Sequence, residues 1–165
     1  MNYTEDIDFS VYPSMLQEYL YCKRFIYFMF VLDIPQREGS RYKVLKGREK
    51  HEEKSHYKYV PVGTLEKKTN VTLYSDKHRL HGVVDEVHFL VDSTAAILDY
   101  KFAEYKGVIW DTLKYQAVLY STLVEDTYNV KCRKAFICYT RSQNKTVELK
   151  IEPEDYNRLF EFCDE

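Results

Sequence analysis

The feature that most constrains the fold is a pair of neighbouring segments in which side chains alternate in character. Residues 79–91 and 95–102 are each typical of a β-strand, and the motif "DST" at 92–94 predicts a tight turn between them. Because successive side chains on a strand point to opposite faces, the two segments predict a hairpin with one apolar face. The sequence therefore predicts a sheet at the centre of the molecule.

Three charged residues, Asp85, Asp99 and Lys101, interrupt this apolar face. If the turn centres on Ser93, Asp85 lies opposite Lys101 and Val87 lies opposite Asp99, so that the charges gather at one end. Buried charges are costly unless they are paired or bind a metal. Two neighbouring carboxylates favour a divalent cation, and hard oxygen ligands suit Mg²⁺ or Mn²⁺. The alternative is a buried ion pair between Asp85 and Lys101, with Asp99 at its rim.

The remaining pattern predicts an α/β protein with a mixed central sheet flanked by helices. The expected strands besides the hairpin are 70–75, 133–140 and 146–151, and the expected helices are 13 to about 32, 41–59, 111–126 and 153–162. Asp111 is the expected N-cap of its helix. A single domain, 1–165, would then combine a helical N-terminal part (12–59), a sheet–helix core (70–151) and a C-terminal helix (153–163).

Composition bears on the class of protein and on its location in the cell. The chain has 165 residues, a net charge of −2 and 30% charged residues, which is typical of a globular domain and not of a strongly basic nucleic-acid binder. No stretch is apolar for long enough to span a bilayer, and the acidic N-terminus lacks the basic start of a signal peptide. We therefore expect a cytoplasmic protein without membrane association.

Two further polar positions bear on the charged cluster. On the helix at 111–126, Gln116 falls on the stripe that faces the sheet, and Tyr120 lies one turn further on. A core glutamine is usually satisfied by hydrogen bonds, so this pattern alone leaves its role open. His51 lies on the polar helix at 41–59, and it gains meaning only if it faces the same cluster.

Five motifs occur in an order that resembles a known family. They are "YCKRFIYF", "GREKHE", "HGVVDEV", "LDYK" and "QAVLY". Their order and spacing resemble the RecB-type nucleases of the PD-(D/E)xK superfamily, which have a restriction-endonuclease-like core. The first motif narrows the resemblance to the CRISPR-associated RecB-like exonucleases of the spacer-acquisition machinery. The resemblance extends over about residues 12 to 150.

The resemblance implies metal-dependent hydrolysis of DNA, in which Mg²⁺ or Mn²⁺ supports the trimming of single-stranded DNA ends for spacer acquisition. It implies that His51, Asp85 and Asp99 are metal ligands, with Asp85 as the central one. The backbone carbonyl of Tyr100 would complete the ligand set. CRISPR adaptation integrase proteins would be the partners.

The same resemblance implies roles for the remaining catalytic residues. Lys101 would orient the attacking water and balance charge at the scissile phosphate. Gln116 and Tyr120 would position that lysine and the DNA backbone.

The cysteines depart from the family pattern. The family commonly holds a 4Fe–4S cluster with one N-terminal cysteine, which Cys22 matches, and three near the C-terminus, where this sequence has only Cys163. Cys132 and Cys138 flank an expected internal strand and would have to be recruited from the sheet. We therefore expect no complete cluster in this chain, either because it was lost or because the chain is short.

Two alternatives remain open at this point. One is a non-catalytic subunit that recognises DNA ends and docks on the adaptation integrase. The other is a stand-alone RecB-type nuclease of phage or repair origin. The complete set of catalytic residue types speaks against the first, because a scaffold has no need of Lys101.

Overall fold

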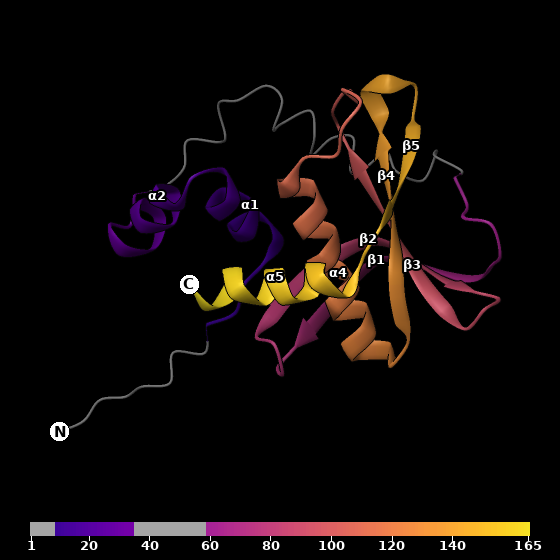
Figure 1. Cartoon of the computed structure of the whole chain (residues 1–165), viewed down its shortest axis with the longest axis horizontal. Helices are drawn as coiled ribbons and strands as arrows, with labels where there is room; N and C mark the ends of the chain where they lie inside the picture. Colours follow the sequence, from indigo (N-terminus) through magenta and orange to yellow (C-terminus); the bar gives the residue numbers. More distant parts are fainter. Residues whose placement is uncertain (1–8, 35–58) are drawn as a thin grey trace.

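The computed structural model describes residues 9–34 and 59–165 (Figure 1). At its centre is a five-stranded sheet in which the strands lie side by side in chain order. Its members are β1 (Thr64–Ser75), β2 (Leu80–Leu90), β3 (Thr94–Lys101), β4 (Lys131–Tyr139) and β5 (Lys145–Lys150). The β3–β4 pair is parallel and the others are antiparallel. The expected α/β class with a mixed sheet is confirmed.

Helices flank the sheet, and α4 connects its parallel strands. The helical elements are α1 (Pro13–Tyr21), α2 (Lys23–Ile26), the π-helical turn η1 (Tyr27–Val31), α4 (Asp111–Tyr128), the 3₁₀ turn η4 (Thr140–Ser142) and α5 (Pro153–Asp164). A parallel pair needs a crossover connection, and α4 supplies it between β3 and β4. In Figure 1, α4 lies along the sheet, α1 lies beside α4, and α5 crosses α4. No helix of the described part of the chain is both long and apolar enough to cross a bilayer.

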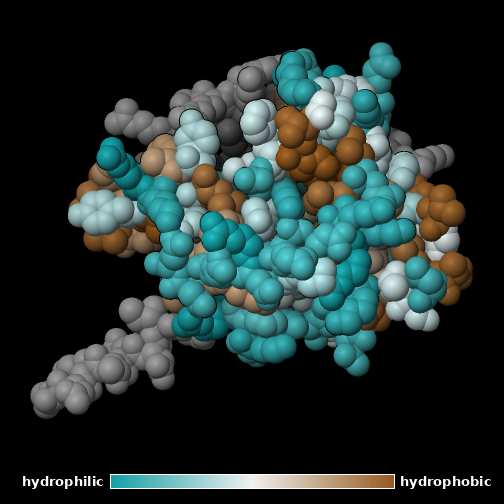
Figure 2. Space-filling model, in the orientation of Figure 1, coloured by the Kyte–Doolittle hydropathy of each residue, from teal (hydrophilic) through white to brown (hydrophobic). Residues whose placement is uncertain are grey.

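The single helix expected from 13 to about 32 is wrong, because the chain breaks at Cys22. This residue is extended (φ −163°, ψ 113°) and separates α1 from α2. The break allows α1 to bury Met15 and Leu16 while the following segment runs away from the sheet. Figure 2 shows apolar side chains gathered at this end of the molecule, where Phe30 and Val31 are exposed. Residues 41–58 of the helix expected at 41–59 lie outside the described residues, and Tyr59 is not helical.

The N-cap of α4 is Trp110, so the prediction for Asp111 is wrong by one residue. Trp110 is extended, and its carbonyl accepts the N–H groups of Leu113 and Lys114. Asp111 instead occupies the first turn, where a carboxylate interacts favourably with the helix dipole.

Two clusters of buried apolar side chains lie on the two faces of the sheet. The larger packs against α4 and α1 and includes Leu16, Val84, Val87, Ile97, Ala117, Leu119, Leu123 and Ala135. The smaller consists of Leu90, Ala96, Leu98, Tyr100, Phe136 and Cys138. Successive residues of β3 belong to alternate clusters, as the period-two pattern predicts.

The register of the β2–β3 hairpin differs from the expected one by two residues. Val87 pairs with Ile97 and not with Asp99, so the turn centres on Asp92. The Asp92 carboxylate accepts the N–H of Thr94 at 3.0 Å and its hydroxyl at 2.6 Å, which fixes this turn. Because the difference is an even number of residues, the side chains keep their faces.

Strand β2 changes phase at Asp85. Val84 and Val87 both belong to the cluster under α4, although strict alternation would place residues three positions apart on opposite faces. Val83, which the alternation places on the apolar face, is 51% exposed. On β1, Asn70 lies between the residues that pair with Val84 and Glu86, and it has a positive φ of 50°. Asp85 therefore lies at a local distortion of the paired strands.

Candidate active site

The site lies where β2 and β3 separate. The last ladder pair is Glu86 with Leu98. Beyond it, the Asp85 carboxylate accepts the backbone N–H of Tyr100 at 2.9 Å. A side chain thus satisfies a strand N–H that a neighbouring strand carbonyl would otherwise accept. This bond fixes the buried Asp85 carboxylate beside the end of β3.

Asp99 and Lys101 form an ion pair on the face that packs against α4. The Lys101 Nζ lies 2.8 Å from Asp99 Oδ2, and their side chains are 17% and 6% exposed. The alternative ion pair between Asp85 and Lys101 is therefore wrong, and Asp99 is buried instead of lying at a rim. The two-residue difference in register explains this, because Asp85 comes next to the backbone of Tyr100 and not opposite Lys101.

Gln116 of α4 connects the lysine to two helices. Its Oε1 accepts a hydrogen bond from Lys101 Nζ at 2.6 Å and another from Gln17 Nε2 at 2.8 Å. Its Nε2 donates to the Tyr120 hydroxyl at 3.2 Å. A lysine ammonium can only donate, so it fixes the orientation of the Gln116 amide. The structure thus brings together Lys101, Gln116 and Tyr120, as the spacing on the helix suggested.

Gln17 of α1 is a member of this cluster that sequence reasoning missed. It lies 99 residues from Gln116, and its position on α1 looks like that of any half-buried polar residue. A partial signal exists in Pro13, one turn earlier, whose ring packs close to Gly82. Pro13 indicates the position of Gln17 only when α1 is known to pack against α4.

Gly82, in the motif "HGVVDEV", permits this close packing. A Cβ at this position would lie 3.1 Å from Cε1 of Tyr120 and 3.2 Å from Cδ and Cγ of Pro13. Contacts this short are tighter than ordinary packing, so any larger residue would push α1 or α4 away from β2.

The surroundings of Tyr120 keep its hydroxyl protonated. Burial raises its pKa, and the negative charges of Asp99 and Asp85 raise it further. The phenol therefore stays neutral, and it accepts the hydrogen bond from Gln116 while keeping its own proton to donate.

Tyr100 is also held from the opposite face of the sheet. Its hydroxyl donates to Glu86 Oε1 at 3.0 Å, and the other carboxylate oxygen of Glu86 lies 2.9 Å from His88 Nε2. Burial alone would raise the pKa of Glu86, but the hydrogen bond to His88 and the positive charge of Lys67 lower it below its ordinary value. Tyr100 is thus held by two carboxylates, since Asp85 accepts its backbone N–H and Glu86 accepts its hydroxyl.

The oxygen donors at the fork suit a hard divalent cation. Asp85 and Asp99 would supply carboxylates and Tyr100 would supply its backbone carbonyl, which are the ligand types that Mg²⁺ and Mn²⁺ prefer. His51 lies outside the described residues. Among the described residues, no group of three His, Cys, Asp or Glu side chains gathers as a metal site. The chemistry of these oxygen donors fits a divalent cation. His51, the third side-chain ligand expected from the sequence, lies outside the described residues.

Two of the four cysteines lie on opposite faces of the sheet. Cys132 is buried under α4, whereas Cys138 belongs to the cluster on the other face of the sheet, so the two cannot serve one metal cluster. Cys22 lies at the junction of α1 and α2, and Cys163 lies near the end of α5. All four are free thiols.

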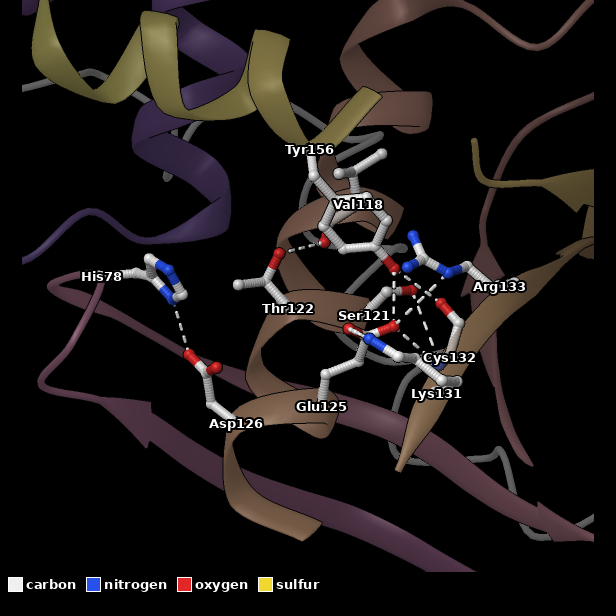
Figure 3. A network of polar contacts seen from close by, with 10 residues as sticks. All are labelled: His78, Val118, Ser121, Thr122, Glu125, Asp126, Lys131, Cys132, Arg133 and Tyr156. Atoms are coloured by element: carbon white, nitrogen blue, oxygen red, sulfur yellow. Dashed lines mark hydrogen bonds and ion pairs between the residues drawn. The ribbon is translucent and has the colours of Figure 1, made fainter. Parts of the chain in front are cut away.

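A second polar cluster anchors α4 at its other end (Figure 3). Glu125 accepts the N–H of Cys132 at 2.8 Å and the hydroxyl of Tyr156 at 3.2 Å, and Lys131 and Arg133 lie close to its carboxylate. Tyr156 also donates to the Cys132 carbonyl at 2.8 Å. These contacts join α4, β4 and α5 at the end of the helix away from Gln116.

Comparisons with known proteins agree with the resemblance that the motifs suggest. No protein-family model matches the chain. Over 160 residues it is 25% identical to the CRISPR-associated exonuclease Cas4 of Francisella tularensis subsp. novicida (strain U112), an alignment that covers 93% of this chain and 78% of that protein. Its fold is similar to the crystal structure of SSO0001, with a TM-score of 0.54 and 15% identity over 94% of this chain and 73% of that one. The chain thus shares weak sequence similarity with a named exonuclease, and the structural likeness shows the fold alone.

Proposed function

We propose that this chain is a metal-dependent DNA nuclease with a PD-(D/E)xK site, which hydrolyses phosphodiester bonds at DNA ends. The observation that carries the proposal is the buried cluster of Asp85, Asp99, Lys101 and Gln116 at the fork between β2 and β3. The similarity to a CRISPR-associated exonuclease supports this class of activity. We further propose that it trims single-stranded ends during spacer acquisition, together with the adaptation integrase.

Asp85, Asp99 and the carbonyl of Tyr100 would hold Mg²⁺ or Mn²⁺, and His51 is proposed as a further ligand. A divalent ion at such a site lowers the pKa of bound water and neutralises charge on a phosphate. An iron–sulfur cluster is not required by the proposal, although Cys22 matches one position of the family pattern.

The chain's own residues prepare the reacting groups. The ion pair to Asp99 and the hydrogen bond to Gln116 hold the Lys101 ammonium in one place, where it can orient a water and balance charge on the phosphate. Tyr120 supports Gln116 from the next turn of α4. Because these side chains are mostly buried, their interactions are stronger than they would be in bulk water.

The proposal is tested by cleavage of an end-labelled single-stranded oligonucleotide with Mn²⁺, with Mg²⁺ or with a chelator. We expect wild-type protein to cleave only with metal, and Lys101→Ala and Asp99→Ala to lose cleavage. Lys131→Ala is the control, because it removes an exposed lysine at the start of β4 and should cleave normally. DNA that is bound but stays intact under every condition would contradict the proposal and favour the non-catalytic end-recognition subunit.

A further inference from the structure

Exposed cations lie just beyond Lys101, where β3 and β4 end. The hydroxyl of Thr140 donates to the Lys101 carbonyl at 3.1 Å, and the backbone N–H of Arg141 donates to the Ala103 carbonyl at 3.2 Å. These bonds connect η4 to the segment that follows Lys101, and Figure 1 shows this segment beside the β4–β5 hairpin. The side chain of Arg141 is 41% exposed. A surface that solvent reaches therefore adjoins the candidate site.

Lys145, the first residue of β5, lies in the same row of the sheet as Lys101. Tyr139 is in register with Lys101 on the parallel side of β4 and pairs with Lys145 on its antiparallel side. Residues paired in this way lie on one face, so both lysines belong to the face that carries the site. Adjacent strands are about 4.8 Å apart, which separates the two lysine backbones by about 10 Å. About three stacked nucleotides of one DNA strand span this distance, at about 3.4 Å each.

Aromatic rings of the segment after Lys101 hold two of these cations. The Lys145 ammonium lies 4.6 Å from the centroid of the Tyr105 ring, and the guanidinium carbon of Arg141 lies 5.7 Å from that of Phe102. The face of an aromatic ring attracts a cation electrostatically. Both cations are also exposed, so their N–H groups stay accessible to a ligand.

Positive charge exceeds negative charge among these residues. Glu104 pairs with Lys106 at 2.6 Å and with Nη2 of Arg141 at 3.1 Å. A guanidinium has five N–H donors, so this pairing occupies only part of the capacity of Arg141. Within the part of the chain that the structure describes, Lys145 pairs with no carboxylate. The surface therefore suits an anionic ligand.

We propose that Arg141 and Lys145 bind phosphates of the DNA strand beside the scissile linkage, within about three nucleotides of it. This inference rests on the proposed nuclease function and names a substrate-binding surface that the five motifs do not contain. Lysine and arginine side chains that neutralise phosphates contribute affinity that is independent of base sequence. These contacts hold the strand while Lys101 faces the scissile phosphate.

The first test measures binding of a fluorescein-labelled single-stranded oligonucleotide by anisotropy, in chelator and at several salt concentrations. Arg141→Ala/Lys145→Ala should bind severalfold more weakly than wild type. The slope of log Kd against log salt should fall by about 1.4, because each phosphate contact on a single strand contributes about 0.7. An unchanged slope in this variant would overturn the inference.

Lys134→Ala/Lys150→Ala is the matched control. It removes the same amount of charge from two exposed lysines that pair with each other at the opposite end of β4 and β5, and it should bind as wild type does. Arg141→Lys/Lys145→Arg keeps both charges and should keep the wild-type slope and unfolding temperature. A control that weakens binding as much as Arg141→Ala/Lys145→Ala, or an exchange variant with the reduced slope, would contradict a specific phosphate contact.

The second test locates the contact along the strand. A single neutral methylphosphonate replaces one linkage at a time around the cleaved one, and cleavage with Mn²⁺ is measured. At a linkage within about three positions of the cleaved one, it should slow the wild type severalfold and Arg141→Ala/Lys145→Ala hardly at all, because the variant has already lost the contact. Equal slowing of both proteins at every linkage would reject the proposed contact.

A failure of the nuclease assignment itself is distinguishable, because binding in chelator requires no cleavage. If wild type cleaves under no condition and Arg141→Ala/Lys145→Ala still shows the reduced salt slope, the proposed function fails and the phosphate-binding surface stands. If wild type cleaves and the variant keeps the full slope, the nuclease assignment stands and this inference fails.

Discussion

At the scale of single residues, the amide of Gln116 joins three side chains. Its oxygen accepts hydrogen bonds from both Lys101 and Gln17, and its nitrogen donates to Tyr120. The position of the lysine therefore depends on α1 as well as on β3 and α4. In the proposed mechanism, Gln17 is a positioning residue that acts through Gln116.

Gln17→Met tests this role, because methionine keeps the length and packing of the side chain and removes the donor. A neutral hydrogen bond contributes about 1 kcal/mol, so kcat should fall about fivefold while KM stays constant. Ser14→Ala, an exposed change on the same helix, is the control and should leave both constants unchanged. A normal kcat in Gln17→Met would show that Lys101 is aligned without α1.

At the scale of elements, the site depends on how closely α1 and α4 approach β2. Gly82 permits that approach, and the cluster around Glu125 fixes the other end of α4. These two contact regions should have different consequences, because only the contacts of Gly82 lie beside the proposed catalytic residues.

Gly82→Ala should lower the free energy of unfolding by about 1–3 kcal/mol and also lower kcat, because its Cβ pushes against Tyr120 and Pro13. Gly63→Ala is a matched control. Gly63 lies just before β1 and has a positive φ, and a Cβ there would lie 3.1 Å from Cγ2 of Val91. The variant should therefore lose stability and keep its kcat. The free energy of unfolding is measured by urea denaturation, and kcat is measured in the cleavage assay. Equal losses of kcat in the two variants would show that Gly82 acts through general stability alone.

Glu125→Ala leaves the buried N–H of Cys132 without its acceptor, so the free energy of unfolding should fall by about 2 kcal/mol. Cleavage by the folded protein should continue, because Glu125 lies at the end of α4 away from Gln116. Glu161→Ala, an exposed change on α5, should alter stability by less than about 0.5 kcal/mol. A stability loss no larger than that of Glu161→Ala would contradict the structural role of this cluster.

At the scale of the whole molecule, the site is assembled from parts that are distant in sequence. Asp85 comes from β2, Asp99 and Lys101 from β3, and Gln116 from α4, and α1 closes the cluster with Gln17. Metal bound at such a site would connect the elements that carry it. Binding to the folded state alone should therefore stabilise the entire chain.

Saturating Mn²⁺ should raise the unfolding temperature of wild-type protein. At a concentration about 100 times the dissociation constant, binding to the native state contributes about 2.7 kcal/mol. Asp99→Ala should show little or no rise, although it folds without metal. A rise of the same size in both proteins would place the ion elsewhere.

Much of this arrangement was predictable from local sequence patterns. The alternation in 79–91 and 95–102 predicts the hairpin and its buried face, and helical spacing predicts that Gln116 faces the sheet. Other features depend on contacts that local patterns do not encode. The register of the β2–β3 hairpin depends on hydrogen bonds that Asp92 makes within the turn. The break between α1 and α2 depends on the extended backbone of Cys22.

Gln17 is a member of the cluster that no local pattern predicts. It reaches Gln116 only after α1 has packed. A glutamine is not unusual at its position in the sequence. The proposed role of His51 stays a prediction, because it lies outside the described residues.

The measurement that tests the central claim most directly is a Mn²⁺ titration of wild type and Asp85→Asn, in which metal binding and cleavage of a 5′-labelled single-stranded oligonucleotide are followed together. Asp85→Asn keeps the shape of the side chain and removes its charge. The account predicts that wild-type cleavage rises with occupancy of the ion and that Asp85→Asn loses both tight binding and cleavage. Cleavage that persists in Asp85→Asn, or in wild type with a chelator, would contradict the assignment of a metal-dependent nuclease site to the fork between β2 and β3.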